Sequence, residues 1–207
     1  MTAPIRALGF CAALALLLPG CATPSRQGPY AGETDKPRLQ LTGRFAAQYQ
    51  PAGESSLRSI SGRFEWIELP GKLTIDLATP LGATLARIES DSTRTTLKTA
   101  SGELFEAASA EDLTSRTLGW RLPVSGLRFW LRGQSDPQKP AHLMVDDGGR
   151  RTLEQDGWRI QTLETFEPAD KPCDSAGCLP ARPARLNLER IDAAEPRLQL
   201  KLVIDRD

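Results

Sequence analysis

The chain is 207 residues long and carries 26 basic and 26 acidic side chains, so its formal net charge is zero. This balance gives no electrostatic basis for binding nucleic acid, and we expect no nucleic acid as a partner. Roughly 170 residues follow the N-terminal segments described below, which is enough for one domain with a hydrophobic core.

The first twenty residues have the layout of a bacterial lipoprotein signal peptide. Arg6 gives a positive start, residues 7–18 are apolar, and Leu-Pro-Gly-Cys at residues 18–21 looks like a lipobox. The apolar run is too short to span a bilayer, which needs about 20 residues. We therefore expect residues 1–20 to be cleaved and Cys21 to carry a covalent N-acyl diacylglycerol. The alternative is an ordinary secretory signal peptide in which the cysteine has no role.

The next segment, residues 21–37 with the lipidated Cys21, is expected to be a flexible tether. Proline and glycine are scattered through it and no apolar periodicity appears, so it cannot bury enough surface to fold. In sorting signals similar to those of enterobacteria, an aspartate at the position of Ala22 favours the inner membrane. We therefore expect the outer membrane, with the domain at residues 38–207 on its periplasmic face.

Alternating apolar and polar residues predict strands after the tether. Between Leu39 and Tyr49 every second residue is apolar or small, and the turn Pro70-Gly71 separates two further alternating runs. Each of these strands has one apolar face. The pattern predicts six strands before any helix, at residues 39–49, 60–66, 73–77, 85–88, 93–98 and 103–107.

Two short helices are predicted in the middle of the domain. Ser109 followed by Asp112 is typical of a capping box, and Gly119 is a C-terminal stop for the first helix. Pro123 is tolerated at the first position of the second helix, which ends before Gly133. The apolar stripe of this second helix consists of Val124, Leu127, Trp130 and Leu131.

Strands resume after the helices. Asp156-Gly157 is a hairpin signal, and the pattern predicts strands at residues 142–145, 151–155, 158–166, 184–191 and 198–204. An antiparallel sheet of this size with one apolar face must curl and cover that face, and the two helices are the only predicted elements that can cover it. We therefore predict a mainly β fold with a small α part. It is a half-open antiparallel β-barrel of about eleven strands, covered by two short helices, with an apolar cavity inside.

The remaining polar candidates do not form a catalytic or metal site. Cys173 and Cys178 are the only other cysteines after Cys21, and their spacing suits a local disulfide in an oxidising periplasm, with free thiols as the alternative. A metal site needs further cysteine or histidine ligands that the chain lacks. His142 is the only histidine and has no nearby serine or cysteine partner. No nucleotide-binding loop or nucleophile elbow occurs. We therefore expect no enzyme, no metal and no cofactor besides the lipid.

Several motifs occur in order along the predicted domain. They are Arg63-Phe64-x-Trp66, Thr79-Pro80-Leu81-Gly82-x-Thr84, Leu118-Gly119-Trp120-x-Leu122-Pro123, Leu127-x-x-Trp130-Leu131-x-Gly133 and Gly157-Trp158. With these motifs and its final leucine-alternating strand, the whole domain resembles the outer-membrane lipoprotein receptor LolB family, which is structurally similar to its soluble partner LolA. Two departures are a loop with two cysteines that looks like an insertion, and the absence of a tryptophan after the last strand.

The resemblance implies a monomeric receptor that accepts lipoproteins from the periplasmic carrier LolA and inserts them into the outer membrane. Each buried methylene of an acyl chain is worth about 0.8 kcal/mol, so the chains cannot cross the periplasm exposed, and an apolar cavity must hold them. The expected cavity lining is Phe45, Phe64, Trp66, Ile75, Leu77, Leu127, Trp130 and Trp158. The alternative for these residues is that they only form a packed core.

A second expected feature is an apolar residue at a hairpin tip, Leu81 between Pro80 and Gly82. An apolar side chain exposed at a turn loses hydrophobic stabilisation unless it meets another surface. In the resembled family the matching leucine protrudes and is associated with delivery into the membrane, so we expect residues 80–82 to be a membrane-insertion loop. The alternative is that Leu81 folds back under the barrel.

Two other functions are compatible with the same pattern. A structural or assembly lipoprotein of the outer membrane shares the signal and the β-rich domain but has a filled interior. A lipid-trafficking module with the same fold shares the cavity but does not receive lipoproteins from a carrier.

Overall fold

Residues 36–51, 54–166 and 181–206 are described by the structure, a computed structural model. The strands β1 to β6 are Leu39–Tyr49, Arg58–Leu69, Lys72–Ala78, Thr84–Ser90, Thr95–Thr99 and Leu104–Ala107. The helices α1 (Ala110–Leu118) and α2 (Val124–Trp130) come next. The strands β7 to β11 are Ala141–Val145, Arg151–Gln155, Trp158–Thr165, Pro183–Arg190 and Leu198–Ile204.

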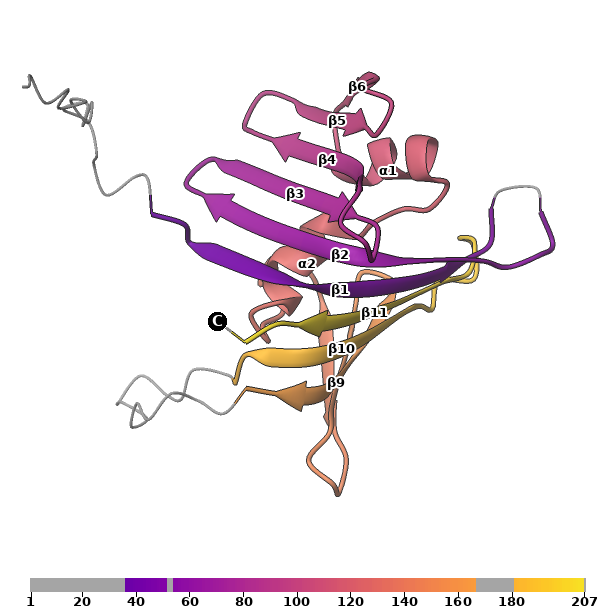
Figure 1. The fold of residues 1–207 in the computed structure, drawn as a ribbon. Coiled ribbons are helices and arrows are strands. Elements are labelled where there is room, and N and C mark those ends of the chain that lie inside the picture. The colour runs from indigo at the N-terminus through magenta and orange to yellow at the C-terminus, as the bar shows by residue number, and fades with distance from the viewer. Residues whose placement is uncertain (1–35, 52–53, 167–180, 207) are drawn as a thin grey trace, which may run out of the picture. The chain divides into compact units, whose positions relative to one another are not determined.

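The eleven strands form one antiparallel sheet, in which β6 lies at one edge and β7 at the other (Figure 1). Strands that follow one another in the chain are hydrogen-bonded neighbours, except that the helices separate β6 from β7. The sheet is joined in the middle by β1 and β11, and it stays open because its edge strands do not pair. These features confirm the predicted half-open sheet with two covering helices.

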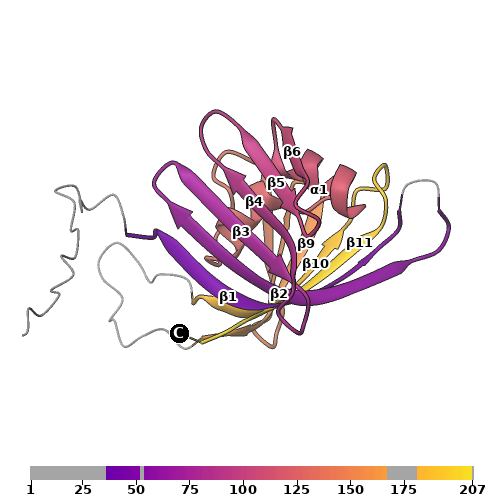
Figure 2. The ribbon, with the colours of Figure 1, turned by 45° about the horizontal axis from the view of Figure 1, so that its top comes forward.

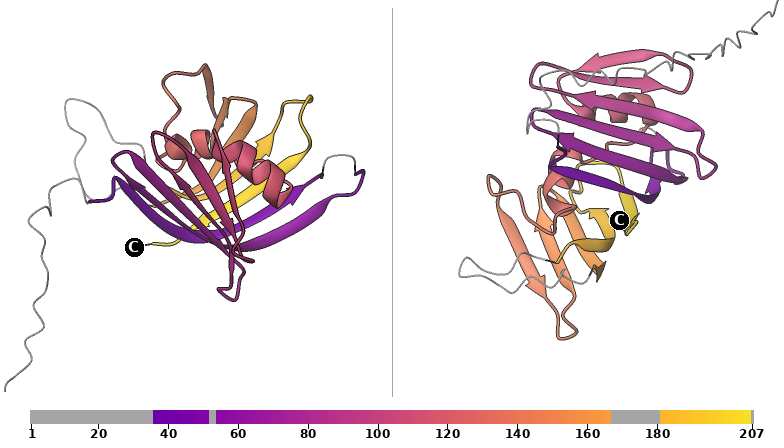
Figure 3. Two further views of the ribbon diagram at one scale, coloured as in Figure 1. Left: turned by 90° about the horizontal axis from the view of Figure 1, so that it is seen from above. Right: turned by 60° about the vertical axis from the view of Figure 1, so that its left-hand side comes forward.

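The sheet curls around α1, as seen from two directions in Figures 2 and 3. The curling follows from burial, because side chains on the inner face alternate with exposed ones along each long strand. Cross-strand rows of apolar side chains cover this inner face. One row runs through Leu41, Trp66, Ile75, Ile88 and Leu97, all nearly inaccessible to solvent.

Two glycines bring phenylalanine rings close to the backbone at the centre of the inner face. Gly62 lies opposite Phe45, and Gly43 lies opposite Phe64. A methyl group on Gly62 would lie 2.0 Å from the carbonyl oxygen of Ala78 and 2.9 Å from the ring of Phe45. Because the nearer atom belongs to the backbone, rotating a side chain cannot relieve the clash.

We therefore expect Gly62→Ala to lower the free energy of unfolding by about 1–3 kcal/mol, the usual cost of overpacking. Urea denaturation measures this difference. The matched control is Ser61→Ala, since the adjacent Ser61 is exposed on the outer face and its change should be nearly neutral. Equal stability of both variants would contradict the close approach at Gly62.

The ends of α1 confirm the predicted signals. The hydroxyl of Ser109 accepts a hydrogen bond from the backbone N–H of Asp112 at 3.2 Å, and Gly119 closes the helix with a φ of 77°. The start of α2 differs slightly from the prediction. Pro123 precedes the helix with a non-helical ψ of 64° and offers no side-chain cap. Among the residues described, no helix is long and apolar enough to cross a membrane.

Candidate functional site

An apolar pocket lies between the inner face of the sheet and the helical segment, and we call it the inner pocket. Six of the eight side chains expected to line a cavity lie around it: Phe45, Phe64, Trp66, Ile75, Leu77 and Leu127. The other lining residues are Trp120, Leu122, Leu131, Leu200 and Leu202. Its free volume is about 30 Å³, so in this conformation packed side chains fill nearly all of the space expected for an acyl chain.

The other two expected residues, Trp130 and Trp158, lie outside the inner pocket. Their rings are 6.3 Å apart, and the indole N–H of Trp130 donates to Oε1 of Gln155 at 3.1 Å. The ring of Trp158 lies under the guanidinium of Arg190 at 4.8 Å. Trp130 instead lines a second groove of about 200 Å³ at the β7 side of the sheet, together with Leu143, Leu153 and Ile160.

Five lining residues were not among the expected cavity residues. Leu131 belongs to the apolar stripe predicted for the second helix, so its inward direction could have been read from that stripe. Leu200 and Leu202 belong to the alternating pattern of the last strand, so their inward direction could have been read from it. Trp120 and Leu122 lie in the connector between α1 and α2, which has no periodicity that assigns a direction. The signals for them were their apolar character and their place in the motif Leu118-Gly119-Trp120-x-Leu122-Pro123.

Two residues that line the inner pocket have an indole nitrogen without a hydrogen-bond partner in the described part of the chain. They are Trp66 and Trp120, which are only 2% and 4% exposed to solvent. A buried N–H without an acceptor costs about 1–3 kcal/mol, and buried tryptophan usually finds a partner. Both atoms belong to residues around a pocket lined only by apolar and aromatic side chains, so no side chain of its lining supplies an acceptor.

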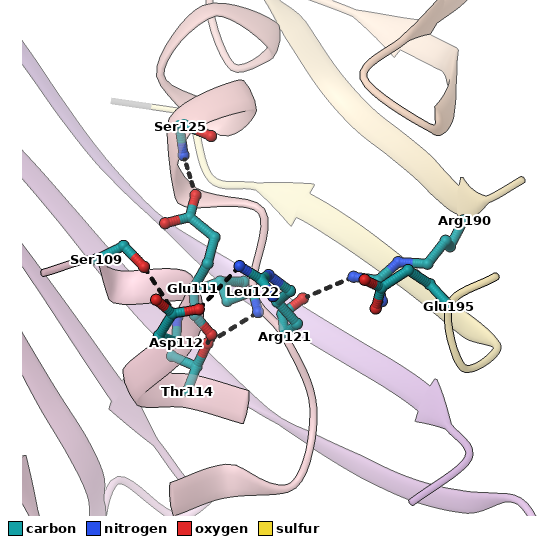
Figure 4. Close-up of polar contacts among 9 residues, drawn as sticks. All are labelled: Ser109, Glu111, Asp112, Thr114, Arg121, Leu122, Ser125, Arg190 and Glu195. Carbon is teal, nitrogen blue, oxygen red and sulfur yellow. Dashed lines mark hydrogen bonds and ion pairs between the residues drawn. The ribbon is translucent and has the colours of Figure 1, made fainter. Parts of the chain in front are cut away.

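Hydrogen bonds fix the connector between the helices, as Figure 4 shows. The buried hydroxyl of Thr114 accepts from the backbone N–H of Leu122 at 2.9 Å and donates to the carbonyl of Glu111 at 3.1 Å. The carboxylate of Glu111 accepts from the backbone N–H of Ser125 at 2.8 Å and so supplies the cap that Pro123 lacks. These contacts link the two helices into one covering unit.

Arg190 connects this unit to the other half of the sheet. Its guanidinium pairs with Glu195 at 3.1 Å and donates to the carbonyl oxygen of Arg121 at 3.4 Å (Figure 4). Burial lowers the pKa of the Arg190 guanidinium from its ordinary value, and the charge of Glu195 opposes this effect. The same guanidinium covers the ring of Trp158, its cross-strand partner on β9.

A buried carboxylate holds α2 against the sheet. Glu68, near the end of β2, accepts hydrogen bonds from Arg128 at 3.0 Å and from Arg132 at 2.8 Å. The side chain of Glu68 is 9% exposed, so both ion pairs are partly protected from solvent screening. We call these three residues the Glu68 clamp.

The turn between β3 and β4 carries Leu81, which is 98% exposed. The backbone N–H of Gly82 donates to the carbonyl of Thr79 at 2.9 Å, and the hydroxyl of Thr79 accepts from the N–H of Ala83 at 3.1 Å. Gly82 has a φ of 90°, which suits glycine at the end of such a turn. In Figure 3 (left) the turn extends from the sheet on the side away from α1. Leu81 therefore projects instead of folding back.

The expected lipid attachment at Cys21 and the expected pairing of Cys173 with Cys178 lie outside the described residues, as do the signal peptide and most of the tether. Within the described ranges, no group of three or more histidine, cysteine, aspartate or glutamate side chains could hold a metal ion.

A family model described as "Outer membrane lipoprotein LolB" matches residues 37–206. The chain belongs to this family. It is 39% identical to the outer-membrane lipoprotein LolB of Cupriavidus pinatubonensis, covering 94% of this chain and 91% of the relative. Identity to the LolB of Cupriavidus metallidurans is 36%, over 94% of this chain and 93% of that one. The chain is therefore an outer-membrane lipoprotein anchored by lipid.

Among solved structures, a LolA superfamily protein from Nitrosomonas europaea aligns over 84% of this chain and 87% of its own, with a TM-score of 0.39 and 10% sequence identity.

Proposed function

We propose that this protein is a receptor that accepts lipoproteins from the periplasmic carrier LolA, holds their acyl chains in the inner pocket, and inserts them into the outer membrane. The observation that carries the proposal is that two residues lining the apolar inner pocket, Trp66 and Trp120, have buried indole N–H groups without a partner among the described residues. A lipidated cysteine offers long hydrocarbon chains together with ester and amide carbonyls. Such a ligand supplies the acceptors that the lining lacks.

The pocket must enlarge before a chain can enter, because its free volume is only about 30 Å³. We infer that the covering unit moves to enlarge the pocket. The contact that must then break is the Glu68 clamp, which holds α2 to β2. One hydrogen bond to a charged group is worth about 1.5–3 kcal/mol. A palmitoyl chain has about 14 methylenes and gains roughly 11 kcal/mol on burial, so it can open the clamp and still bind.

A comparison of the affinities for a diester and a diether lipid tests whether the two indole N–H groups bind lipid carbonyls. We expect the protein to bind a dipalmitoyl glycerol ester about tenfold more tightly than the matching diether, which has the same chains but no carbonyls. Trp66→Phe with Trp120→Phe should remove this preference. The smaller rings leave unfilled space that lowers stability, and the loss of two unpaired N–H groups offsets part of that cost. Titration with both lipids, followed by protein fluorescence, gives the two affinities.

Trp130→Phe is the matched control, since the indole N–H of Trp130 is already bonded to Gln155. We expect this variant to lose stability and to keep the preference for the ester. Equal binding of diester and diether by the wild-type protein would contradict the role of the indoles, and failure to bind either lipid would contradict acyl binding itself.

Release into the membrane is assigned to the turn at residues 79–83. The exposed Leu81 can enter the hydrocarbon region, where its side chain gains about 1.5–3 kcal/mol on burial. The hydrogen bonds of Thr79 make the turn rigid, so little ordering entropy is lost when it inserts.

The whole proposal is tested by mixing the protein with LolA that carries a labelled lipoprotein and separating the two proteins. Transfer of the label to this protein supports the receptor function. If the protein binds free lipid but takes no lipoprotein from LolA, it is a lipid-trafficking module. If it binds neither, it is a structural lipoprotein with a permanently filled interior.

A further inference from the structure

The outer face of the sheet carries two arginines directly opposite each other, Arg44 on β1 and Arg63 on β2. Both are exposed, and neither has an ion pair or hydrogen bond to its side chain among the described residues. Like charges in directly opposed positions destabilise a sheet. Arg63 belongs to the motif Arg63-Phe64-x-Trp66. The two aromatic residues of this motif face inward, whereas Arg63 faces outward and does not line the inner pocket.

Other arginines of the same face are neutralised. Arg87 pairs with Asp76 at 2.5 Å, Arg159 with Glu154 at 2.8 Å, and Arg185 with Glu164 at 3.2 Å. The cross-strand neighbours beyond the arginine pair are uncharged, Ala78 next to Arg63 and Val203 next to Arg44. The next row carries acids that bond to other residues. Glu65 accepts from Gln40 at 3.4 Å, Asp76 pairs with Arg87, and Asp205, beside Thr42, accepts from its hydroxyl at 3.4 Å. The positive charge of Arg44 and Arg63 is therefore directed at solvent.

A hollow adjoins the pair on the same face. Ala46 and Ser61, two residues along from Arg44 and Arg63, lie opposite each other and line a depression of about 280 Å³. Lys201, the cross-strand partner of Ala46 on β11, lines it too. Small side chains beside three cations leave room for an anionic group of moderate size.

The membrane-directed turn lies on this side of the sheet. Ala78, the cross-strand partner of Arg63, is the last residue of β3, and the turn with Leu81 follows it directly. Figure 3 (left) shows the turn leaving the sheet on the side opposite α1. Arg44 and Arg63 are exposed between buried inner-face residues, so they belong to the same outer side. An apolar tip beside unneutralised arginines matches the layering of a membrane surface, where hydrocarbon lies below phosphate groups.

We infer that Arg44 and Arg63 bind the phosphates of phospholipid headgroups when Leu81 enters the membrane, so that the outer face of the sheet lies on the bilayer. This inference rests on the proposed insertion of Leu81. Guanidinium groups suit phosphate because their fork of N–H donors matches two phosphate oxygens. The orientation leaves the face covered by α1 and α2 turned away from the membrane, where an arriving lipoprotein can reach the inner pocket.

Vesicle binding tests the inference with a chain that begins at residue 21 and carries Cys21→Ala, so that no lipid anchors it. Vesicles consist either of phosphatidylcholine alone or of a mixture with roughly one-third phosphatidylglycerol. We expect tighter binding to the anionic vesicles. Arg44→Gln with Arg63→Gln should lower that binding about 30-fold, since each basic residue near an anionic surface contributes about 1 kcal/mol. Binding to neutral vesicles should change far less.

The matched control is Arg94→Gln with Arg150→Gln, which removes the same charge from the turns before β5 and β8. It should keep most of the anionic binding. If both double variants lose the same amount of binding to anionic vesicles, the effect depends only on net charge and the inference is overturned. No loss of binding in either variant would also overturn it. The melting temperature of the Arg44 and Arg63 variant should be unchanged or higher, which shows that it folds.

Two further arms separate the alternatives. Inorganic phosphate at constant ionic strength should not displace the protein from vesicles, and full displacement would identify a free-anion site instead of a membrane contact. Leu81→Glu should weaken binding to neutral and anionic vesicles alike. If it does so while the arginine variant binds normally, the headgroup contact is wrong and the insertion of Leu81 stands.

Discussion

Leu81→Glu should abolish delivery of lipoproteins into the membrane and leave their uptake from LolA unchanged. The side chain is 98% exposed on a hydrogen-bonded turn and is absent from the lining of the inner pocket, so the substitution should not disturb the fold or the pocket. Replacing a leucine that gains about 1.5–3 kcal/mol in hydrocarbon by a charge that costs about 2.5–3.5 kcal/mol disfavours insertion by roughly 4 kcal/mol or more. This corresponds to about a thousandfold.

Uptake and delivery are measured separately. Transfer of labelled lipoprotein from LolA to the variant reports uptake, and flotation of the label with liposomes reports delivery. Leu104→Glu is the matched control, because Leu104 is also an exposed leucine but lies on the edge strand β6. The control should behave like the wild type in both assays. Equal loss of uptake and delivery in the Leu81 variant, or loss of neither, refutes the role of this turn.

Glu68→Gln should make the protein less stable but a tighter binder of acyl chains. The neutral amide is a weaker acceptor for Arg128 and Arg132, so the free energy of unfolding should fall by about 1–3 kcal/mol. If the closed pocket must open before binding, the same loss raises the population of the open form. A change of 1.4 kcal/mol strengthens the apparent affinity about tenfold.

Urea denaturation and titration with a palmitoyl lipid measure the two quantities on one sample. Glu65→Gln is the control, since Glu65 lies on the outer face of the same strand and should affect neither strongly. Weaker stability together with weaker lipid binding would mean that the Glu68 clamp shapes the pocket without limiting its opening.

The strands and helices could be predicted because their sequence patterns reflect local physics. Alternation along residues 39–49 follows from one buried face, and the turn at Asp156-Gly157 has both residues at positive φ, as a tight hairpin requires. The capping residue Ser109 and the stop at Gly119 fixed α1. The joining of β1 to β11, by contrast, depends on contacts between the two ends of the domain, and no local pattern reports it.

The candidate site was less accessible from sequence. Periodicity shows that Trp130 and Phe45 face inward, but not that Gln155 holds Trp130 at another part of the interior. Trp120 lies in a connector whose course is set by hydrogen bonds with Thr114 and Arg190. No sequence pattern links Thr114 to the connector, and Arg190 lies far along the chain from it. The free volume of the pocket depends on how all these side chains interdigitate, which composition and spacing cannot express.

The central claim is that the inner pocket opens to receive lipid acyl chains. It is tested most directly by recording the indole N–H resonances of the ¹⁵N-labelled protein while a triacylated lipopeptide is added. We expect the signals of Trp66 and Trp120 to move to positions typical of hydrogen-bonded indoles, with the signal of Trp130 little changed. Saturating lipopeptide that leaves both pocket signals in place would contradict the claim.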